Sequence, residues 1–149
     1  MNSLTQADDW FEQQRLHCAA EDGEVSEVQR LLASGFSLDA YDDIGFTPLH
    51  HAARSEHYKI AVLLLEAGSN VNAHDQDRAG ETAIGVAARG HYPEMVELLL
   101  QHGANPDISG WMGLTARLRA AHRTDEDGKS ILALIERFRP SPKPSKAAR

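Results

Sequence analysis

The sequence has almost no cysteine and no long hydrophobic run. Its 149 residues include a single cysteine, Cys18, which cannot form an internal disulfide, whereas secreted domains of this size usually carry several cysteines. No stretch approaches the ~20 apolar residues that a membrane-spanning helix needs. The first residues carry acids instead of the basic and apolar segments of a signal peptide. These absences favour a cytoplasmic protein without membrane insertion.

The sequence also lacks the short motifs that mark common enzyme sites. It has no glycine-rich phosphate loop, no Gly-x-Ser-x-Gly turn and no His-Glu-x-x-His metal motif. Cys18 follows His17 directly, but neighbouring side chains on a helix point apart, and Cys18 lies in a stretch expected to face the core. We therefore expect no catalytic residue, no metal site and no cofactor. The histidines left without a repeat-related position have no cysteine or carboxylate at ligand spacing: His51, His74, His91 and His122.

Composition and charge indicate one folded, acidic domain. Apolar residues make up 42% of the chain and charged residues 25%, as is usual for globular domains. Residues 139–149 hold four basic residues and no acid, which leaves 11 basic and 22 acidic residues, a charge of -11, in residues 1–138. A body this negative would be repelled by phosphate backbones, so nucleic acid is not expected as the main ligand. The Pro- and Ser-containing tail fits a flexible, solubilising end, with contact to RNA or anionic lipid as the alternative.

An internal repeat is the most informative feature of the chain. Pairs of alanines recur at 19–20, 52–53, 87–88 and 120–121, at spacings of 33, 35 and 33 residues. Gly35, Gly68 and Gly103 recur in the same register, each preceded by a leucine-rich stretch. A fixed period of this length is typical of a solenoid built from stacked helical repeats.

Within one period the residues predict a helix, a turn, a second helix and a loop. Thr47 is placed to cap the first helix, with Pro48 at its first position. The second helix, over residues 58–66, is apolar all round and is expected to lie between neighbours. Gly68 ends it, and residues 70–80 supply turn-forming side chains for a projecting loop.

The segment FTPLHHAARSEHYKIAVLLLEAGSNVNAHD closely resembles an ankyrin repeat. The resemblance covers roughly residues 13–138 and divides them into copies at 13–45, 46–80, 81–113 and 114–138, between a helical extension at 1–12 and the tail. It implies an all-α solenoid of about four helix-turn-helix repeats with projecting hairpin-like finger loops, and with histidines such as His17 and His50 in inter-repeat hydrogen bonds. The third copy departs from the family at Ala83 and Gly85, and the fourth has Arg117 in place of a core leucine.

The resemblance implies that a partner protein binds the concave face, formed by the finger loops and the exposed positions of each first helix. The two positions after the alanine pairs of repeats two to four give a basic strip that contains Arg54, Ser55, Arg89, His122 and Arg123, whereas the first pair is followed by Glu21 and Asp22. Trp111 either seals the last repeat or anchors a partner. Aromatic residues and arginine are common interface anchors, and the finger loops add Tyr41, Asp43, Ile44, Phe46, His74, Asp77, Arg78, Trp111 and Met112.

These inferences predict a non-catalytic, cytoplasmic protein-binding scaffold, with a monomer as the favoured state. The segment from Gly110 to Thr115 and the charged repeat after it are similar to the end of small stand-alone bacterial ankyrin proteins. Some proteins of that kind neutralise a cognate toxin as immunity proteins. An adaptor or regulator of another protein and a structural, self-associating protein are the alternatives that the sequence leaves open.

Overall fold

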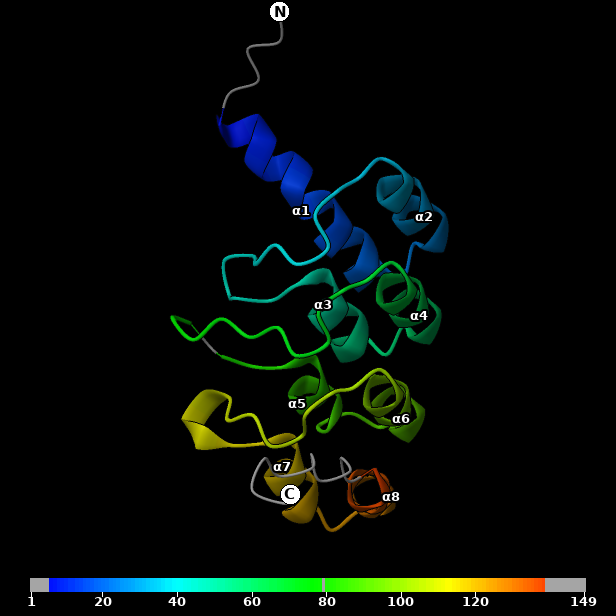
Figure 1. Cartoon of the computed structure of the whole chain (residues 1–149), viewed down its shortest axis with the longest axis vertical. Helices are drawn as coiled ribbons and strands as arrows, with labels where there is room; N and C mark the ends of the chain where they lie inside the picture. Colours follow the sequence, from blue (N-terminus) through cyan, green and yellow to red (C-terminus); the bar gives the residue numbers. More distant parts are fainter. Residues whose placement is uncertain (1–5, 79, 139–149) are drawn as a thin grey trace, which may run out of the picture.

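The computed structural model describes residues 6–78 and 80–138, in which four helix pairs are stacked one after another (Figure 1). The first helices of the pairs stand in one column and the second helices in another (Figure 1). The described residues form helices, turns and loops without a strand, which confirms the all-α prediction. The pairs are α1 (Gln6–Asp22) with α2 (Val25–Ala33), α3 (Pro48–Arg54) with α4 (Tyr58–Glu66), α5 (Ala83–Ala87) with α6 (Pro93–Gln101), and α7 (Ala116–Ala121) with α8 (Glu126–Arg137).

Local sequence explains where these helices begin and end. Thr47 is the extended N-cap of α3, with Pro48 in the first turn, where a missing N–H costs little. Helix α4 spans the predicted residues 58–66, and Gly68 follows it with φ +106°, a left-handed conformation that glycine adopts without strain. Helix α1 begins at Gln6 and continues to Asp22.

The core runs through all four helix pairs. Helix α1 packs on α3, α3 on α5, and α5 on α7, while each first helix also contacts its own second helix. Leu16, Leu49 and Ile84 occupy one repeat position and are fully or almost fully buried. The second helices fill the other half of the core with the buried side chains Val28, Leu31, Ile60, Leu64, Met95, Leu99, Ile131 and Ile135.

Arg117 occupies the same repeat position in the last pair, and its surroundings explain the substitution. In the described part of the chain no helix pair follows α8, so this position is not covered and the Arg117 side chain is 27% exposed. Its Nε donates to Asp107 Oδ1 at 2.8 Å and its Nη1 to Glu136 Oε1 at 2.7 Å. The hydrogen bonds from Arg117 lower the pKa of Asp107. Arg117 thus gives the last repeat a polar end.

Two histidines join neighbouring repeats through backbone carbonyls: the Nε2 atoms of His50 and His57 lie 2.5 and 3.0 Å from the carbonyl oxygens of Glu81 and Glu21 respectively. The family resemblance implied such a bond for His50. His17 differs from that expectation, because its Nε2 lies 2.7 Å from the carbonyl oxygen of Ala40, in the loop of its own repeat. The Thr47 N–H donates to His50 Nδ1 at 3.1 Å, so Nε2 of His50 carries the proton that Glu81 accepts.

Cys18 corrects one expectation. It is exposed instead of facing the core, because α1 is the first helix of the described stack and α3 covers only one of its sides. The tail 139–149 and the first five residues lie outside the described residues. Among the helices that the structure describes, none combines the length and apolar character needed to cross a bilayer.

Candidate functional site

Three loops project from the same side of the stack, each leading from a second helix to the next first helix (Figure 1). We call them finger loop 1 (34–47), finger loop 2 (67–82) and finger loop 3 (102–115). Backbone hydrogen bonds close the tips of finger loops 1 and 3: Asp42 N–H donates to Phe46 O, and Gly110 N–H to Leu114 O, both at 2.9 Å. The tips of these two loops are therefore hairpin-like turns.

The tips of finger loops 1 and 3 expose large apolar side chains. Trp111 is 58% exposed and Met112 74% exposed, in a 3-10 turn that spans Trp111–Gly113. Finger loop 1 adds Tyr41 and Ile44, which are 38% and 47% exposed. Trp111 therefore does not seal the last repeat. Met112 has φ +59°, an uncommon backbone conformation for a residue with a side chain.

A buried ion pair holds the turn that carries Trp111. The Trp111 N–H donates to Glu81 Oε1 at 3.0 Å, and Arg119 Nη2 donates to the same oxygen at 2.5 Å. The Glu81 and Arg119 side chains are only 5% and 8% exposed. Two glycines make room for the carboxylate, because a Cβ on Gly85 or Gly110 would lie 3.1 Å from its atoms. This close approach explains why glycine stands at position 85, which corresponds to His50 of the second repeat.

Sequence reasoning did not identify Glu81 or Arg119, although a signal was present. In repeat register Glu81 takes the place of Phe46, and Arg119 takes the place of His51, both of which are buried in the second repeat. Opposite charges at two interior positions of consecutive repeats predict a buried ion pair once the register is known.

Finger loop 1 is shaped by a second buried contact, between Asp42 and His51. Asp42 Oδ2 lies 2.6 Å from His51 Nε2, while Oδ1 accepts the Ile44 and Phe46 N–H groups at 3.1 and 2.9 Å. Burial raises the pKa of Asp42, but the hydrogen bonds from His51 and the two backbone amides outweigh burial and leave the pKa below its ordinary value. The charged carboxylate therefore fixes the tip that presents Ile44.

A groove separates finger loops 2 and 3. It has a volume of about 330 Å³ and lies beside the Trp111 turn. Arg78 reaches from finger loop 2 to donate to Asp42 O at 2.9 Å and to Asp75 Oδ2 at 3.1 Å. The groove is lined by His74, Gln76, Arg78, Gly80, Ser109, Gly110, Trp111 and Met112.

The basic strip expected from the sequence has a different character in the structure. Arg54 pairs with Glu21 Oε1 at 2.9 Å and lies over the Phe46 ring. Arg123 donates to the carbonyls of Ala88 and Gly90 at 2.9 and 2.6 Å and pairs with Asp125. These two arginines thus have partners in neighbouring repeats, and Arg54 is 41% exposed while Arg123 is 17% exposed.

The remaining strip residues differ in exposure. Arg89 and His122 are exposed, Ser55 is half-buried, and Arg89 has no ion-pair partner among residues 6–78 and 80–138. The prediction that Phe46 contacts a partner is wrong, because Phe46 is only 5% exposed and stacks on His50 inside the repeat. The other finger-loop residues of the sequence prediction, Asp43, Asp77 and Arg78, are exposed, while His74 is half-buried.

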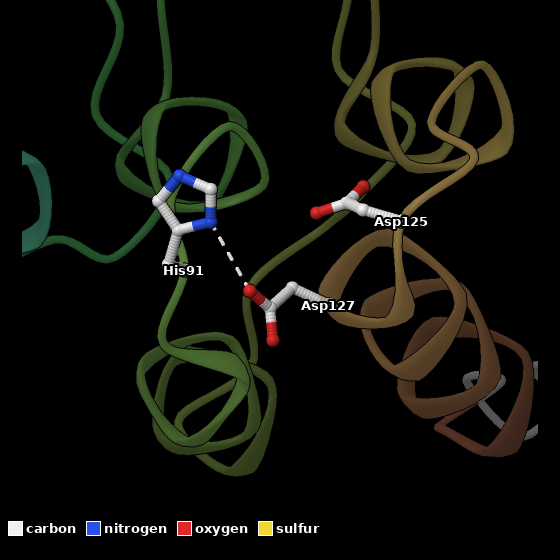
Figure 2. Close-up of side chains that lie close together, drawn as sticks. All are labelled: His91, Asp125 and Asp127. Atoms are coloured by element: carbon white, nitrogen blue, oxygen red, sulfur yellow. Dashed lines mark hydrogen bonds and ion pairs between the residues drawn. The ribbon is translucent and has the colours of Figure 1, made fainter.

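His91 lies close to two carboxylates, although no carboxylate stands at ligand spacing from it in the sequence. His91 Nδ1 is 3.1 Å from Asp127 Oδ2, and Asp125 lies beside them (Figure 2). Sequence spacing hid this group because about one repeat separates His91 from the aspartates. Asp125 is the N-cap of α8 and pairs with the Arg123 guanidinium, which opposes a cation at the same place. The contacts of Asp125 with Arg123 and of Asp127 with His91 thus account for the cluster, and we assign no metal site to it.

Comparison with known proteins identifies the repeat. The family model described as "Ankyrin repeats (3 copies)" matches residues 1–75, and "Ankyrin repeats (many copies)" matches residues 64–120. A Schizosaccharomyces pombe protein named "Ankyrin repeat-containing protein P1E11.10" is 35% identical over 98 residues, which are 66% of this chain and 45% of that protein.

Two further relatives are larger proteins. An Arabidopsis thaliana protein named "Putative E3 ubiquitin-protein ligase XBAT34" is 41% identical over 55% of this chain and 22% of its own length. The "Ankyrin repeat, SAM and basic leucine zipper domain-containing protein 1" of Neofelis nebulosa is 36% identical over 58% of this chain and 19% of its own length. The chain thus spans less than half the length of each of these relatives.

Proposed function

This chain belongs to the ankyrin repeat family, whose repeats are protein-protein interaction modules, and we propose that it binds a partner protein through its finger loops without catalysing a reaction. One observation carries the proposal: Trp111 and Met112 are exposed on a turn whose base is held by a buried ion pair. Tryptophan is among the residues that contribute most to protein interfaces. The proposal includes a cytoplasmic location, in keeping with the single cysteine, and a monomeric state.

A turn fixed before binding favours affinity. Association costs the conformational freedom of every side chain and loop that becomes ordered, so a preformed turn loses less on binding than a mobile one. Trp111 is tied to Glu81 through its own backbone, and Gly110 and Leu114 close the turn by a backbone hydrogen bond. The exposed apolar area at these tips is also the kind of surface that marks interaction sites.

We define the proposed contact surface by the exposed tips. Tyr41 and Ile44 form one end, Trp111 and Met112 the other, and Asp77 and Arg78 lie on the loop between them. Arg54, Phe46 and Arg123, in contrast, hold the scaffold and contribute to binding only by keeping the repeats in place. Arg89 and His122 are exposed at the C-terminal ends of the first helices α5 and α7, whereas the finger loops join these helices at their N-terminal ends.

An adaptor or regulatory role suits the proposal better than toxin immunity. The name of the Neofelis nebulosa relative places ankyrin repeats in a larger protein with SAM and basic leucine zipper domains, and the name of the Arabidopsis thaliana relative is that of a putative E3 ubiquitin-protein ligase. Those names say nothing of toxin neutralisation, so the immunity role expected from the sequence gains no support from them. Both roles would use the finger loops as the binding surface.

Affinity capture with matched variants tests the proposal. The full chain, a Trp111→Ala/Met112→Ala variant and a Tyr58→Ala variant are immobilised, and proteins retained from cells that express the chain are identified by mass spectrometry. Tyr58 is the control because it is an exposed aromatic residue outside the finger loops. We expect a partner that the parent and Tyr58→Ala retain, and whose Kd, measured with purified protein, rises at least ~10-fold in the double variant. Equal binding to all three proteins would contradict the proposal.

A further inference from the structure

The finger loops carry charge of almost one sign. Residues 34–47, 67–82 and 102–115 contain seven acidic residues and a single basic one, Arg78. Interfaces pair surfaces of complementary charge, so this imbalance on the proposed contact surface bears on the partner. The acidic residues are Asp39, Asp42, Asp43, Asp75, Asp77, Glu81 and Asp107.

Arginines neutralise three of the seven carboxylates. Arg78 pairs with Asp75 at 3.1 Å, Arg119 with Glu81 at 2.5 Å, and Arg117 with Asp107 at 2.8 Å. Each pair joins one cation to one finger-loop acid, although Arg117 also contacts Glu136. Four aspartates are left without a lysine or arginine partner among the described residues: Asp39, Asp42, Asp43 and Asp77.

The four remaining carboxylates differ in what they do. Asp42 accepts hydrogen bonds from His51 and from two amides, and Asp39 accepts the Asn70 N–H at 2.9 Å, so both also serve the structure of the loops. Asp43 and Asp77, in contrast, are exposed, and their side chains make no hydrogen bond or ion pair with another described residue. These two carboxylates therefore make no visible contribution to holding the described residues together.

The cations on this side of the molecule do not offset these charges. Arg54 and Arg123 are engaged with Glu21 and with Asp125 and two carbonyls. Arg89 is exposed, but it follows the C-terminal end of α5, whereas finger loop 2 joins that helix at its N-terminal end. The surface formed by the tips of the three finger loops is therefore acidic.

Apolar side chains stand at both ends of this acidic row. Finger loops 1, 2 and 3 follow one another along the stack (Figure 1). Tyr41 and Ile44 lie beside Asp43 in finger loop 1, Asp77 lies in finger loop 2, and Trp111 and Met112 lie in finger loop 3. The exposed tip is thus apolar and acidic in finger loop 1, acidic in finger loop 2 and apolar in finger loop 3.

We infer that the finger loops bind a cationic segment of a partner protein, with lysine or arginine side chains at Asp43 and Asp77 and apolar side chains against Tyr41, Ile44, Trp111 and Met112. This inference rests on the proposed function and adds the chemistry of the partner. Carboxylates without internal partners attract cations and repel acidic segments, and the Trp111 ring can also accept a cation on its face. The basic strip expected from the sequence would have favoured an acidic partner instead, but its arginines are largely used inside the protein.

Selection from a random peptide library displayed on phage tests the inference without a known partner. The probes are random 16-residue peptides, selected at low salt on the immobilised full chain, and then synthesised for binding measurements. We expect selected peptides to be enriched in lysine and arginine together with large apolar residues. For these peptides Asp43→Asn/Asp77→Asn should raise Kd about 3- to 30-fold, and added salt should reduce the difference. A matched control, Glu66→Gln/Glu94→Gln, removes two exposed acids from second helices and should leave Kd unchanged.

The outcomes separate this inference from the proposed function. Acidic or uncharged peptides that lose affinity in Trp111→Ala/Met112→Ala would overturn the inference and leave the finger loops as the binding surface. Basic peptides that bind equally well to Asp43→Asn/Asp77→Asn would also overturn it, as would a selection that enriches no peptide. Peptides that bind Trp111→Ala/Met112→Ala as tightly as the parent would count against both proposals.

Discussion

Glu81 and Arg119 form a buried ion pair between the third and fourth repeats, and the same Glu81 oxygen accepts the Trp111 N–H. Replacing either residue with alanine should cost ~3 to 5 kcal/mol, because the remaining charge would stay buried without a partner. The apolar double variant Glu81→Leu/Arg119→Met should lose much less than the sum of the two single changes. Urea unfolding of the four proteins measures this, and additive losses would contradict a coupled pair.

Leu64 and Leu99 are fully buried at equivalent positions of the second and third repeats. Leu→Ala at either position should lower the free energy of unfolding by ~2 to 5 kcal/mol through lost transfer energy and a residual cavity. Leu118 is 41% exposed on α7 and provides the matched control, with an expected loss below ~1 kcal/mol. Thermal melts in which all three variants behave alike would remove the support for this core.

His50 should make stability depend on pH. Burial lowers its pKa from 6.5 to about 4 in the folded chain. The folded chain therefore favours the neutral form of His50 more than the unfolded chain does. Protonation of His50 does not reduce the free energy of unfolding above pH 6.5, and it reduces it progressively as the pH falls towards 4. At pH 5 the contribution lost is ~2 kcal/mol relative to pH 7.5. Urea unfolding at both pH values should show a smaller pH effect in His50→Gln than in the parent, and an equal effect would refute this role.

Replacing Arg123 should lower the stability of the fold, whereas replacing Arg89 should not. Arg123 donates to the Ala88 and Gly90 carbonyls, so Arg123→Ala should cost ~1 to 3 kcal/mol. Arg123→Lys should restore little, because an ammonium cannot reproduce the planar fork of the guanidinium. Arg89→Ala removes an exposed guanidinium and should change stability by less than ~0.5 kcal/mol. Chemical unfolding curves distinguish these expectations, and similar losses at both positions would contradict them.

Residues 139–149 should contribute little to folding, because they contain no large apolar side chain that could add to the core. A chain that ends at Phe138 should keep its melting temperature within a few degrees of the parent. Binding of a partner through the finger loops should also survive the deletion. A large loss of affinity that disappears at high salt would instead identify the tail as an electrostatic anchor.

The sequence was sufficient to predict the repeat architecture. The alanine pairs, the Thr-Pro helix start and the glycines that follow the second helices act locally or recur at a fixed period, so they specify helix boundaries and stacking without knowledge of distant contacts. Helix α4 begins and ends at the predicted residues for this reason. The finger loops followed from the same register.

The tertiary structure decided which charged residues are available to a partner. Sequence register placed Arg54, Arg89 and Arg123 in one strip, but only the packing of neighbouring repeats shows that Arg54 and Arg123 are bound to the repeats beside them. Likewise, the partners Glu81 and Arg119 lie 38 residues apart, and nothing local in the chain joins them. Ion pairs depend on distances between side chains from different repeats, and a one-dimensional pattern does not contain those distances.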